Sequence, residues 1–521
     1  MVTFPTPQNV VYSDFKGIRT RNGVNTGGSM SAVVCQNVDF VPNTVGTDIQ
    51  IRSTLGNKLV TRYPYFSMIK GFETVQDGIK HCICYVENEE KGMLLEYHFE
   101  DDTFDVLQDE LLVTGQANGI TMNDTAYDVF VFSNGIDYYS VNFATTPITK
   151  VINPVYEEKQ VTGLALAEKD GALVIGSEQL GIVIGSRQGD IYDWDYAVTA
   201  DDKTKPWYQI FGKGVTAIIP YIDGLLVFTK DDSTYLKGNP ADLTTFSRSD
   251  ASIGGCMSFE SWLYHDKYLF FYDDIQKNMY YYTQIDTGQK ILGQPIATEV
   301  QKYFDGLTRV QLVGFIGENR SEIWVLSNKF KLVYDYYVGE WTERVCHDIT
   351  SYFTFDNAVY CTTPDGKLLK EKEGDTNGIF DDKFYPSIYS MQTVNLGSYS
   401  DMKEMEMQPL FTVTDNFENK FWVDCIIDGK KTKSKFVEMF SKGGVWGDDT
   451  DTASIPSNEQ FDVANFASIN DGVTHQVKSK FISNWFYLQF IIRTEEAGQD
   501  FNILAMELKG LTVETDTTGR K

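Results

Sequence analysis

Short apolar runs separated by tight turns recur along the first three quarters of the chain. Each repeat has a short apolar strand, a turn, a strongly β-rich strand, a second tight turn and another β-rich strand. The clearest copies span residues 215–238, 310–344, 118–141 and 161–186, and weaker copies begin near Tyr65, Cys256 and His347. Because short runs of this kind are typical of strands, the pattern predicts consecutive antiparallel hairpins.

Dipeptides that favour tight turns separate the predicted strands. They are Asn134-Gly135, Asp170-Gly171, Asp223-Gly224 and Asp365-Gly366. Asn-Gly and Asp-Gly tolerate the positive φ angles that a two-residue hairpin turn requires. Each pair therefore predicts a hairpin turn at its own position.

The spacing of the repeats indicates a larger architecture. Start-to-start distances run from about 37 to about 54 residues, which overlaps the roughly 40–50 residues of a four-stranded propeller blade. Six or seven such units between residues 65 and 373 would close a β-propeller, whereas unrelated meanders in a sandwich are the alternative. Residues 295–304 form the best helix candidate, as a connector between blades. The recurring order of strands and turns favours the propeller.

The pattern changes after residue 373. A polar, turn-rich stretch at 371–382 (EKEGDTNGIFDD) predicts a boundary, and the strands that follow are longer and alternate better. Residues 384–521 are therefore predicted to form a β-sandwich-like platform domain. Residues 1–64 are predicted to be N-terminal docking or platform strands. The predicted fold class is all-β, with a six- or seven-bladed β-propeller at 65–373 and the C-terminal β-sandwich-like platform.

Composition supports strands and excludes several functions. Aromatic residues make up 14% of the chain, with 30 Tyr and 34 Phe, which favours strands over helices. The formal net charge is −28, and no stretch concentrates Lys and Arg enough to bind a phosphate backbone, which argues against a conventional nucleic-acid reader. The N-terminus has no signal-peptide pattern, and no apolar run is long enough for a membrane span. Seven scattered cysteines suggest buried thiols in a protein assembled in reducing cytoplasm.

No pattern of residues predicts catalysis, a metal site or a cofactor site. The chain has no phosphate-binding loop, no GxSxG elbow and no HExxH helix. His81, Cys82 and Cys84 are close in sequence, but on a strand the two cysteines share one face while His81 points to the other. Buried core thiols are therefore favoured over zinc at this position. The sequence predicts a non-enzymatic protein without a cofactor.

Two alternatives remain open on the sequence. Carboxylate doublets occur at Asp101-Asp102, Asp201-Asp202, Asp231-Asp232, Asp273-Asp274 and Asp381-Asp382, and they are predicted to lie at turns. Two carboxylates that converged across one cleft would indicate a glycan-cleaving propeller. A glycan-binding or glycan-cleaving propeller, acting as a receptor-binding protein or depolymerase, is thus the alternative. A cellular propeller scaffold that binds peptides is the third reading.

Several segments, in order along most of the chain, resemble the tail hub or nozzle β-propeller proteins of short-tailed bacteriophages. They are 14–24 (DFKGIRTRNGV), 35–40 (CQNVDF), 51–60 (IRSTLGNKLV), 217–236 (AIIPYIDGLLVFTKDDSTYL), 252–274 (SIGGCMSFESWLYHDKYLFFYDD), 331–344 (KLVYDYYVGEWTER) and 484–510 (NWFYLQFIIRTEEAGQDFNILAMELKG). The N-terminal segment is also shared with stopper-like propellers of other phages, which leaves the station along the tail open.

The resemblance implies a structural virion protein of the phage tail, assembled in the host cytoplasm. It implies a homohexameric ring below the head-to-tail connector, with the adaptor and other tail proteins or fibres as partners. Genomic DNA would pass through the lumen without specific binding, and no small-molecule substrate is expected. An acidic wall would repel phosphate during ejection, which gives the net charge of −28 a reason.

One segment is a candidate for docking within such a ring. Residues 15–24 are short and punctuated by glycine, and they carry two arginines. The candidate docking residues are Phe15, Gly17, Ile18, Arg19 and Arg21. The segment is predicted to dock against the protein's own platform or a neighbouring ring, and an ordinary edge strand closing the first or last blade is the alternative.

Overall fold

The chain is almost entirely β. The computed structural model describes residues 8–19, 28–42, 49–124, 127–143, 147–196, 202–251, 253–266, 268–282, 294–317, 320–373, 378–393, 402–405, 409–413, 419–439, 473–476, 484–485 and 488–514. Within these residues the single helix is the 3₁₀ helix η1 (Thr298–Phe304). The predicted all-β class is confirmed, and the predicted helix candidate at 295–304 is helical over most of its length.

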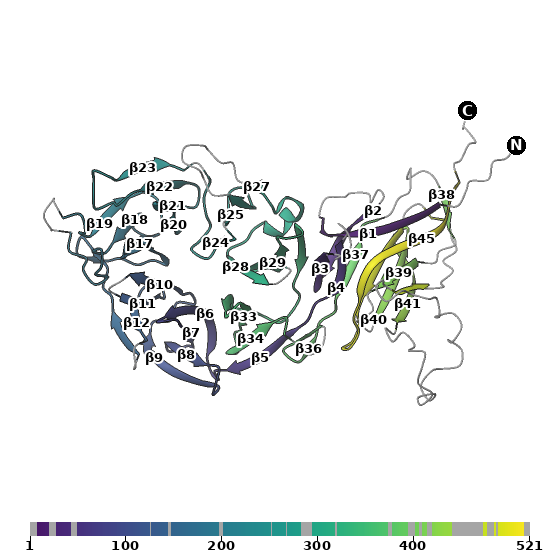
Figure 1. Ribbon diagram of the computed structural model, residues 1–521, viewed down its shortest axis with the longest axis horizontal. Coiled ribbons are helices and arrows are strands. Elements are labelled where there is room, and N and C mark those ends of the chain that lie inside the picture. The colour runs from purple at the N-terminus through teal and green to yellow at the C-terminus, as the bar shows by residue number, and fades with distance from the viewer. Residues whose placement is uncertain are drawn as a thin grey trace. The chain divides into compact units, whose positions relative to one another are not determined.

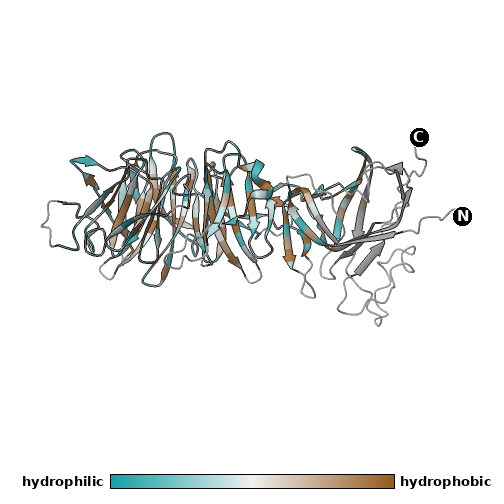
Figure 2. Ribbon diagram, turned by 90° about the horizontal axis from the view of Figure 1, so that it is seen from above, coloured by the Kyte–Doolittle hydropathy of each residue, from teal (hydrophilic) through white to brown (hydrophobic). Residues whose placement is uncertain are grey.

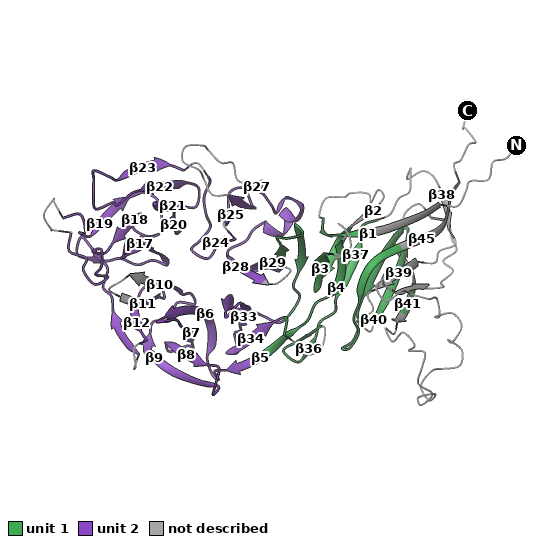
Figure 3. Ribbon diagram, viewed as in Figure 1, with its two compact units in different colours: residues 1–58, 332–346, 372–521 green, residues 59–331, 347–371 purple. Residues whose placement is uncertain are grey.

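Two compact units make up the chain (Figure 3). Unit 1 contains residues 1–58, 332–346 and 372–521, and unit 2 contains residues 59–331 and 347–371. Unit 1 is thus assembled from three separate stretches of sequence. The sequence predicts the consecutive ranges 1–64, 65–373 and 384–521 instead, because composition cannot reveal which distant strands pair.

Unit 2 is a succession of small antiparallel sheets. The four-stranded sheets are β6 (Ser67–Gln76), β7 (Ile79–Glu87), β8 (Gly92–His98) and β9 (Thr103–Leu111); β10 (Asn118–Asp124), β11 (Tyr127–Ser133), β12 (Tyr138–Asn142) and β13 (Ile148–Val151); β16 (Ala165–Lys169), β17 (Ala172–Ser177), β18 (Ile182–Gly185) and β19 (Trp207–Ile210); β20 (Ala217–Tyr221), β21 (Gly224–Phe228), β22 (Ser233–Lys237) and β23 (Ser247–Asp250); and β24 (Trp262–His265), β25 (Tyr268–Asp273), β26 (Asn278–Tyr282) and β27 (Gln294–Pro295). Further strands are the short hairpin β14 (Val155–Tyr156) and β15 (Lys159–Gln160), the hairpin β28 (Val310–Gly317) and β29 (Arg320–Ser327), and the meander β32 (Ser351–Phe355), β33 (Ala358–Thr362) and β34 (Lys367–Glu371).

The first strands of these sheets contact one another in sequence order. Contacts join β6 to β10, β10 to β16, β16 to β20, β24 to β28, β28 to β32, and β32 back to β6. Across the remaining junction, side chains of β20 and β21 pack with those of β25 in one apolar cluster. Figure 1 draws the sheets of unit 2 around a common centre, and Figure 2 shows that their strands are rich in apolar residues while many connecting loops are hydrophilic.

A strand from the N-terminal part of the chain extends the sheet of β32–β34. This strand is β5 (Asn57–Arg62), which lies beside β34. Just beyond it, the N–H of Tyr63 donates to the carbonyl of Gly366 at 2.8 Å. The last sheet of unit 2 is therefore built from both ends of the unit's sequence, which ties the start of the unit to its end.

Two of the four predicted hairpin turns have different outcomes in the structure. Asp170 and Gly171 have φ of 52° and 75° and join β16 to β17, as predicted. The prediction for Asp223-Gly224 is wrong by one residue, because Tyr221 pairs with Gly224 and the turn is formed by Ile222 and Asp223. A Cβ atom at Gly224 would lie 2.2 Å from the carbonyl oxygen of Leu236, so this glycine serves close strand packing rather than the turn.

Unit 1 is organised around its long C-terminal strand, β45 (Asn502–Glu514). This strand pairs with β1, β4, β38 and β39. The other strands of the unit are β1 (Gln8–Ile18), β2 (Gly28–Gln36), β3 (Val38–Pro42), β4 (Ile49–Ser53), β30 (Lys331–Asp335), β31 (Glu340–Glu343), β35 (Ile379–Phe380), β36 (Lys383–Phe384), β37 (Ile388–Met391), β38 (Met402–Met405), β39 (Pro409–Val413), β40 (Asn419–Ile427), β41 (Lys430–Met439), β42 (Val473–Gln476), β43 (Asn484–Trp485) and β44 (Leu488–Arg493). The N-terminal and C-terminal strands therefore belong to one body.

Candidate functional site

The described part of the predicted docking segment, residues 15–19, lies on β1 and at its end and is largely buried in unit 1. Phe15 and Ile18 have no exposed surface. The ring of Phe15 meets that of Tyr389 edge to face at 5.7 Å, and the Tyr389 hydroxyl donates to the carbonyl oxygen of Lys16 at 2.9 Å. Arg21 lies outside the described residues. Phe15 and Ile18 are thus core residues of unit 1.

The buried carboxylate of Glu340 binds the backbone N–H of Gly17 and the guanidinium of Arg19. Gly17 donates its N–H to Oε2 of Glu340 at 2.8 Å, and Nη2 of Arg19 contacts the same oxygen at 2.8 Å. A Cβ atom at Gly17 would lie 2.4 Å from the carbonyl oxygen of Trp341, so the segment needs glycine there. Burial raises the pKa of Glu340 above its ordinary value, although Arg19 and the Gly17 N–H act in the opposite direction.

The strand pairing of β1 bears on this prediction. β1 pairs with β2 in parallel over Tyr12–Ile18 and with β45 in antiparallel over Gln8–Tyr12. The described residues 15–18 of the predicted segment therefore lie in a strand of unit 1 that pairs with β2. Docking against a neighbouring ring and the alternative of an edge strand that closes a blade both stay predictions for the segment.

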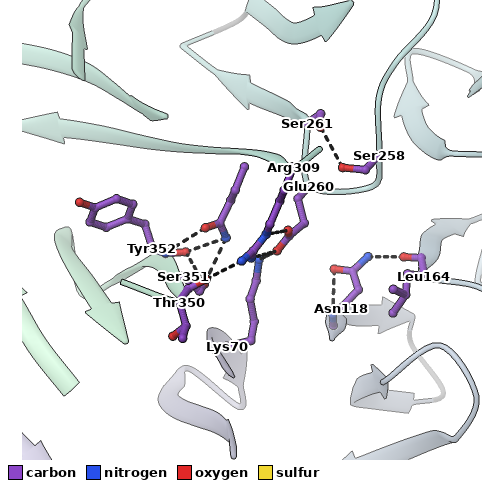
Figure 4. Close-up of polar contacts among 12 residues, drawn as sticks. Lys70, Asn118, Leu164, Ser258, Glu260, Ser261, Arg309, Thr350, Ser351 and Tyr352 are labelled. Atoms are coloured by element: carbon purple, nitrogen blue, oxygen red, sulfur yellow. Dashed lines mark hydrogen bonds and ion pairs between the residues drawn. The ribbon is translucent and has the colours of Figure 1, made fainter. Parts of the chain in front are cut away.

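Unit 2 contains a buried cluster of opposite charges (Figure 4). The ammonium of Lys70 contacts Glu260, and Arg309 binds the same carboxylate through Nε at 2.9 Å and Nη2 at 3.2 Å. Arg309 also donates from Nη1 to the carbonyl of Thr350 at 2.8 Å. Although burial acts to raise it, the two cations hold the pKa of Glu260 below its ordinary value. The cluster joins β6 to the segments before β24, β28 and β32, so it serves to fasten four sheets.

A cavity of about 350 Å³ opens where loops of four neighbouring sheets of unit 2 meet. The segments that lead into the first strands β10, β16, β20 and β24 supply most of its walls, and two turns, β11–β12 and β17–β18, supply the rest. The described lining residues are Thr114, Gln116, Asn134, Gly135, Ile136, Thr162, Gly163, Leu164, Ala165, Glu178, Gln179, Val215, Thr216, Met257, Ser258 and Phe259. This volume reaches the lower end of the range of small-molecule sites.

Hydrogen bonds restrain the loops that form the walls of this cavity. Glu87 accepts from the N–H groups of Thr114 at 2.8 Å and Gly115 at 2.9 Å. Asn118 donates to the carbonyl of Leu164 at 2.7 Å, and the hydroxyls of Ser258 and Ser261 lie 2.8 Å apart. Figure 4 shows the last two pairs. Because these partners already restrain the loops, little ordering is left for a ligand to impose.

The structure agrees with the expectation for the His-Cys stretch. Cys82 and Cys84 are both buried in the apolar cluster between the first sheet and the meander β32–β34. His81 lies on the opposite face, where Nδ1 is 2.6 Å from Glu96 and the ring stacks on Phe143 at 4.1 Å. The two cysteines are thus core thiols. Among the described residues, no group of three or more His, Cys, Asp or Glu side chains could hold a metal ion.

The carboxylate doublets lie at turns wherever the structure describes them. Asp101-Asp102, Asp231-Asp232 and Asp381-Asp382 each lie in the connection between two paired strands, Asp273-Asp274 lies at the end of β25, and Asp201 falls outside the described residues. None of these doublets lines the cavity of unit 2. Within the described part of the chain, no helix has the length and apolar character needed to cross a membrane.

The sequence gives no sign of the long-range polar contacts in the two units or of the cavity. Glu340 is 323 residues from Gly17, and Lys70 is 190 residues from Glu260. The cavity is lined by common turn residues with no recognisable motif. Only the repeat itself carries a signal, because it predicts that the residues just before each first strand recur at equivalent positions.

Comparison with known proteins gives no family. No family model and no curated protein matches the chain. Among solved structures, a computationally designed protein, Ika8, is similar over 61% of this chain and 99% of its own, with 12% identity and a TM-score of 0.36. The extracellular domain of a protein from B. thetaiotaomicron described as a one-component system matches over 76% of this chain and 48% of its own, with 11% identity and a TM-score of 0.38. A protein described as a gluconolactonase matches over 49% and 92%, with 12% identity and a TM-score of 0.29. None of these likenesses carries an argument about function.

Proposed function

We propose that this chain is a structural virion protein, a subunit of a hexameric nozzle or hub ring in the tail of a short-tailed bacteriophage. The observation that carries the proposal is the likeness of seven segments, in order from residue 14 to residue 510, to that family. In this role the protein forms part of the channel for genome ejection and a platform for other tail components. It catalyses no reaction.

Within this proposal, unit 2 is a seven-bladed β-propeller. Seven sequence repeats begin within unit 2 and support this number, and each of them contains strands. The chain of contacts from β6 through to β32 and back to β6 also supports a closed arrangement. The addition of β5 to the β32–β34 sheet fits such closure, because it joins the first and last blades without an extra connection.

Unit 1 is the platform of the ring in the same proposal, with a β-sandwich-like arrangement. Its assembly from three stretches of sequence supports this role, since both termini and the 332–346 insertion are bound into one body. A body that anchors a ring must resist separation of its parts, and pairing of β1 with β45 links the chain ends directly. In sequence, the propeller is inserted into the platform as two stretches, residues 59–331 and 347–371.

The net charge of −28 supports a channel role as well. Acidic side chains on the lumen would repel the DNA backbone and leave it no point of attachment, whereas basic patches would slow its passage. An assembled ring with a basic or neutral lumen, and its acids on the outer surface, would contradict this part of the proposal.

The mass of the purified full-length protein tests the proposed assembly. Light scattering after size exclusion should give six times the chain mass of 59.1 kDa, about 355 kDa. Because some ring proteins assemble only on the particle, the sample is also mixed with purified tail-less connectors. A protein that stays monomeric alone and with connectors would contradict the ring.

A further inference from the structure

The cavity in unit 2 has the chemistry of a sugar site. Its described walls combine hydroxyls and amides (Thr114, Thr162, Gln116, Gln179) with apolar surface from Leu164 and Phe259. Carbohydrates present both kinds of surface, since their hydroxyls exchange hydrogen bonds with side-chain amides while their C–H faces lie against apolar and aromatic side chains. At about 350 Å³ the cavity has room for a ligand of this size class.

The charges around the cavity restrict the class of sugar further. Among the described residues that line it there is no Lys, Arg or His, and the one ionisable group is the carboxylate of Glu178. That carboxylate is paired with Lys230 at 2.9 Å. An anionic sugar would find no cation among the described lining residues, and the Lys230 ammonium beside Glu178 is already paired. The lining therefore favours a neutral sugar.

The described lining favours binding of a sugar over its cleavage. Glycoside hydrolysis with two carboxylates requires that both flank the scissile bond, in most families about 5 to 9.5 Å apart. The described walls supply Glu178 alone, and a carboxylate behind them, Glu87, accepts hydrogen bonds from the loop at Thr114 and Gly115. Glu87 is thus a positioning residue for the wall.

We propose that the cavity of unit 2 binds a neutral saccharide, one or two hexose units in size, without cleaving it. Gln116 and Gln179 exchange hydrogen bonds with its hydroxyls, and Phe259 with Leu164 provides the apolar contact. The site lies wholly within unit 2, so it does not depend on ring formation. For a protein of a tail, such a site would give contact with a neutral glycan at a cell surface.

Binding by the full-length protein tests the site. The probes are methyl glucoside, methyl galactoside, N-acetylglucosamine and maltose, with glucuronic acid and sialic acid as anionic counterparts, measured by saturation-transfer NMR and calorimetry. At least one neutral sugar should bind saturably with a Kd on the order of 1 mM or tighter, and both anionic sugars should bind at least about tenfold more weakly. Failure of all four neutral sugars to saturate by about 20 mM, or tighter binding of an anionic sugar, would overturn the proposal.

Variants locate the binding in the cavity. Gln179 is exposed on the β17–β18 turn, so Gln179→Trp should fill the opening without loss of fold and weaken neutral-sugar binding at least about tenfold. The matched control is Gln276→Trp, on the exposed β25–β26 turn away from the cavity, which should bind as the parent does. Equal binding by Gln179→Trp and the parent would place the sugar elsewhere and overturn the site. Release of reducing ends from maltose would overturn the binding-only assignment.

Discussion

Gly17 donates its backbone N–H to Oε2 of Glu340 at 2.8 Å across 323 residues of sequence. The pair joins the first strand of unit 1 to the hairpin β30–β31, which enters the unit between two long stretches of unit 2. Arg19 and the close approach of Trp341 add to the same contact. This contact therefore joins two of the three stretches of sequence that make up unit 1.

Removal of the Glu340 carboxylate should loosen this contact. Glu340→Ala leaves the Gly17 N–H and the Arg19 guanidinium without their acceptor in a buried position, which should cost about 1–3 kcal/mol of unfolding free energy. Thermal and urea unfolding of unit 1, followed by Trp fluorescence, measures the effect. Glu100→Ala, at an exposed turn, is the control and should change stability by less than about 0.5 kcal/mol. Equal stability of the two variants would contradict the role of Glu340.

A side chain at Gly17 should be poorly tolerated. In Gly17→Ala the new Cβ would meet the backbone oxygen and nitrogen of Trp341 at 2.4 and 2.7 Å, so β1 must shift. Limited proteolysis should then cut the N-terminal segment faster than in the parent. Gly78→Ala is the comparison, because its φ of 77° is strained but its Cβ meets nothing within 4 Å, and it should cost only about 1 kcal/mol. A Gly17→Ala protein as stable as Gly78→Ala would argue against the close contact.

The Lys70–Glu260–Arg309 cluster can be tested by comparing the stability of single and double variants. Glu260→Gln leaves the buried ammonium of Lys70 without its counterion, which should destabilise unit 2 by about 3–5 kcal/mol. The double variant Lys70→Met with Glu260→Gln removes both charges and should recover much of the loss. Denaturant unfolding of the parent, both single variants and the double variant gives the coupling energy. Additive losses, with no recovery in the double variant, would contradict the cluster.

The same carboxylate predicts a pH dependence with a definite sign. The pKa of Glu260 is lower in the folded protein than in the unfolded chain, so the folded state binds fewer protons there. Its contribution to stability is present above the ordinary carboxyl pKa and is lost as the pH falls through the lowered value. The difference in melting temperature between the parent and Glu260→Gln should therefore shrink as the pH is lowered from about 5 to about 3. A difference in melting temperature that grows as the pH falls would contradict the lowered pKa of Glu260 in the folded protein.

The turn between β20 and β21 offers a stabilising substitution. Ile222 is 57% exposed and has a φ of 49°, a conformation that is strained for a β-branched residue. Ile222→Asn should relieve strain at little cost in buried surface and raise the unfolding free energy by about 1 kcal/mol. Ile275→Asn is the matched control, since Ile275 is 58% exposed but is not among the positive-φ residues. Equal effects of the two substitutions would contradict the strained turn.

The sequence predicts the buried strands of unit 2 well and its outer strands poorly. β21 is buried at all five positions, so its apolar run stands out, whereas all four residues of β23 (SRSD) are exposed and show no alternation. The sequence misplaces the turn at Ile222 by one residue, because glycine favours a turn locally while packing against Leu236 requires Gly224 in the strand. Local patterns also carry no information about the Gly17–Glu340 contact or the cavity, since both depend on pairing between distant strands.

The most direct test of the account is the symmetry of the assembled protein. Negative-stain images of the purified full-length protein, alone or with connectors, should show rings with six-fold symmetry and an open centre. Rings of another symmetry, rings with a closed centre, or single particles under every condition would contradict the proposed nozzle.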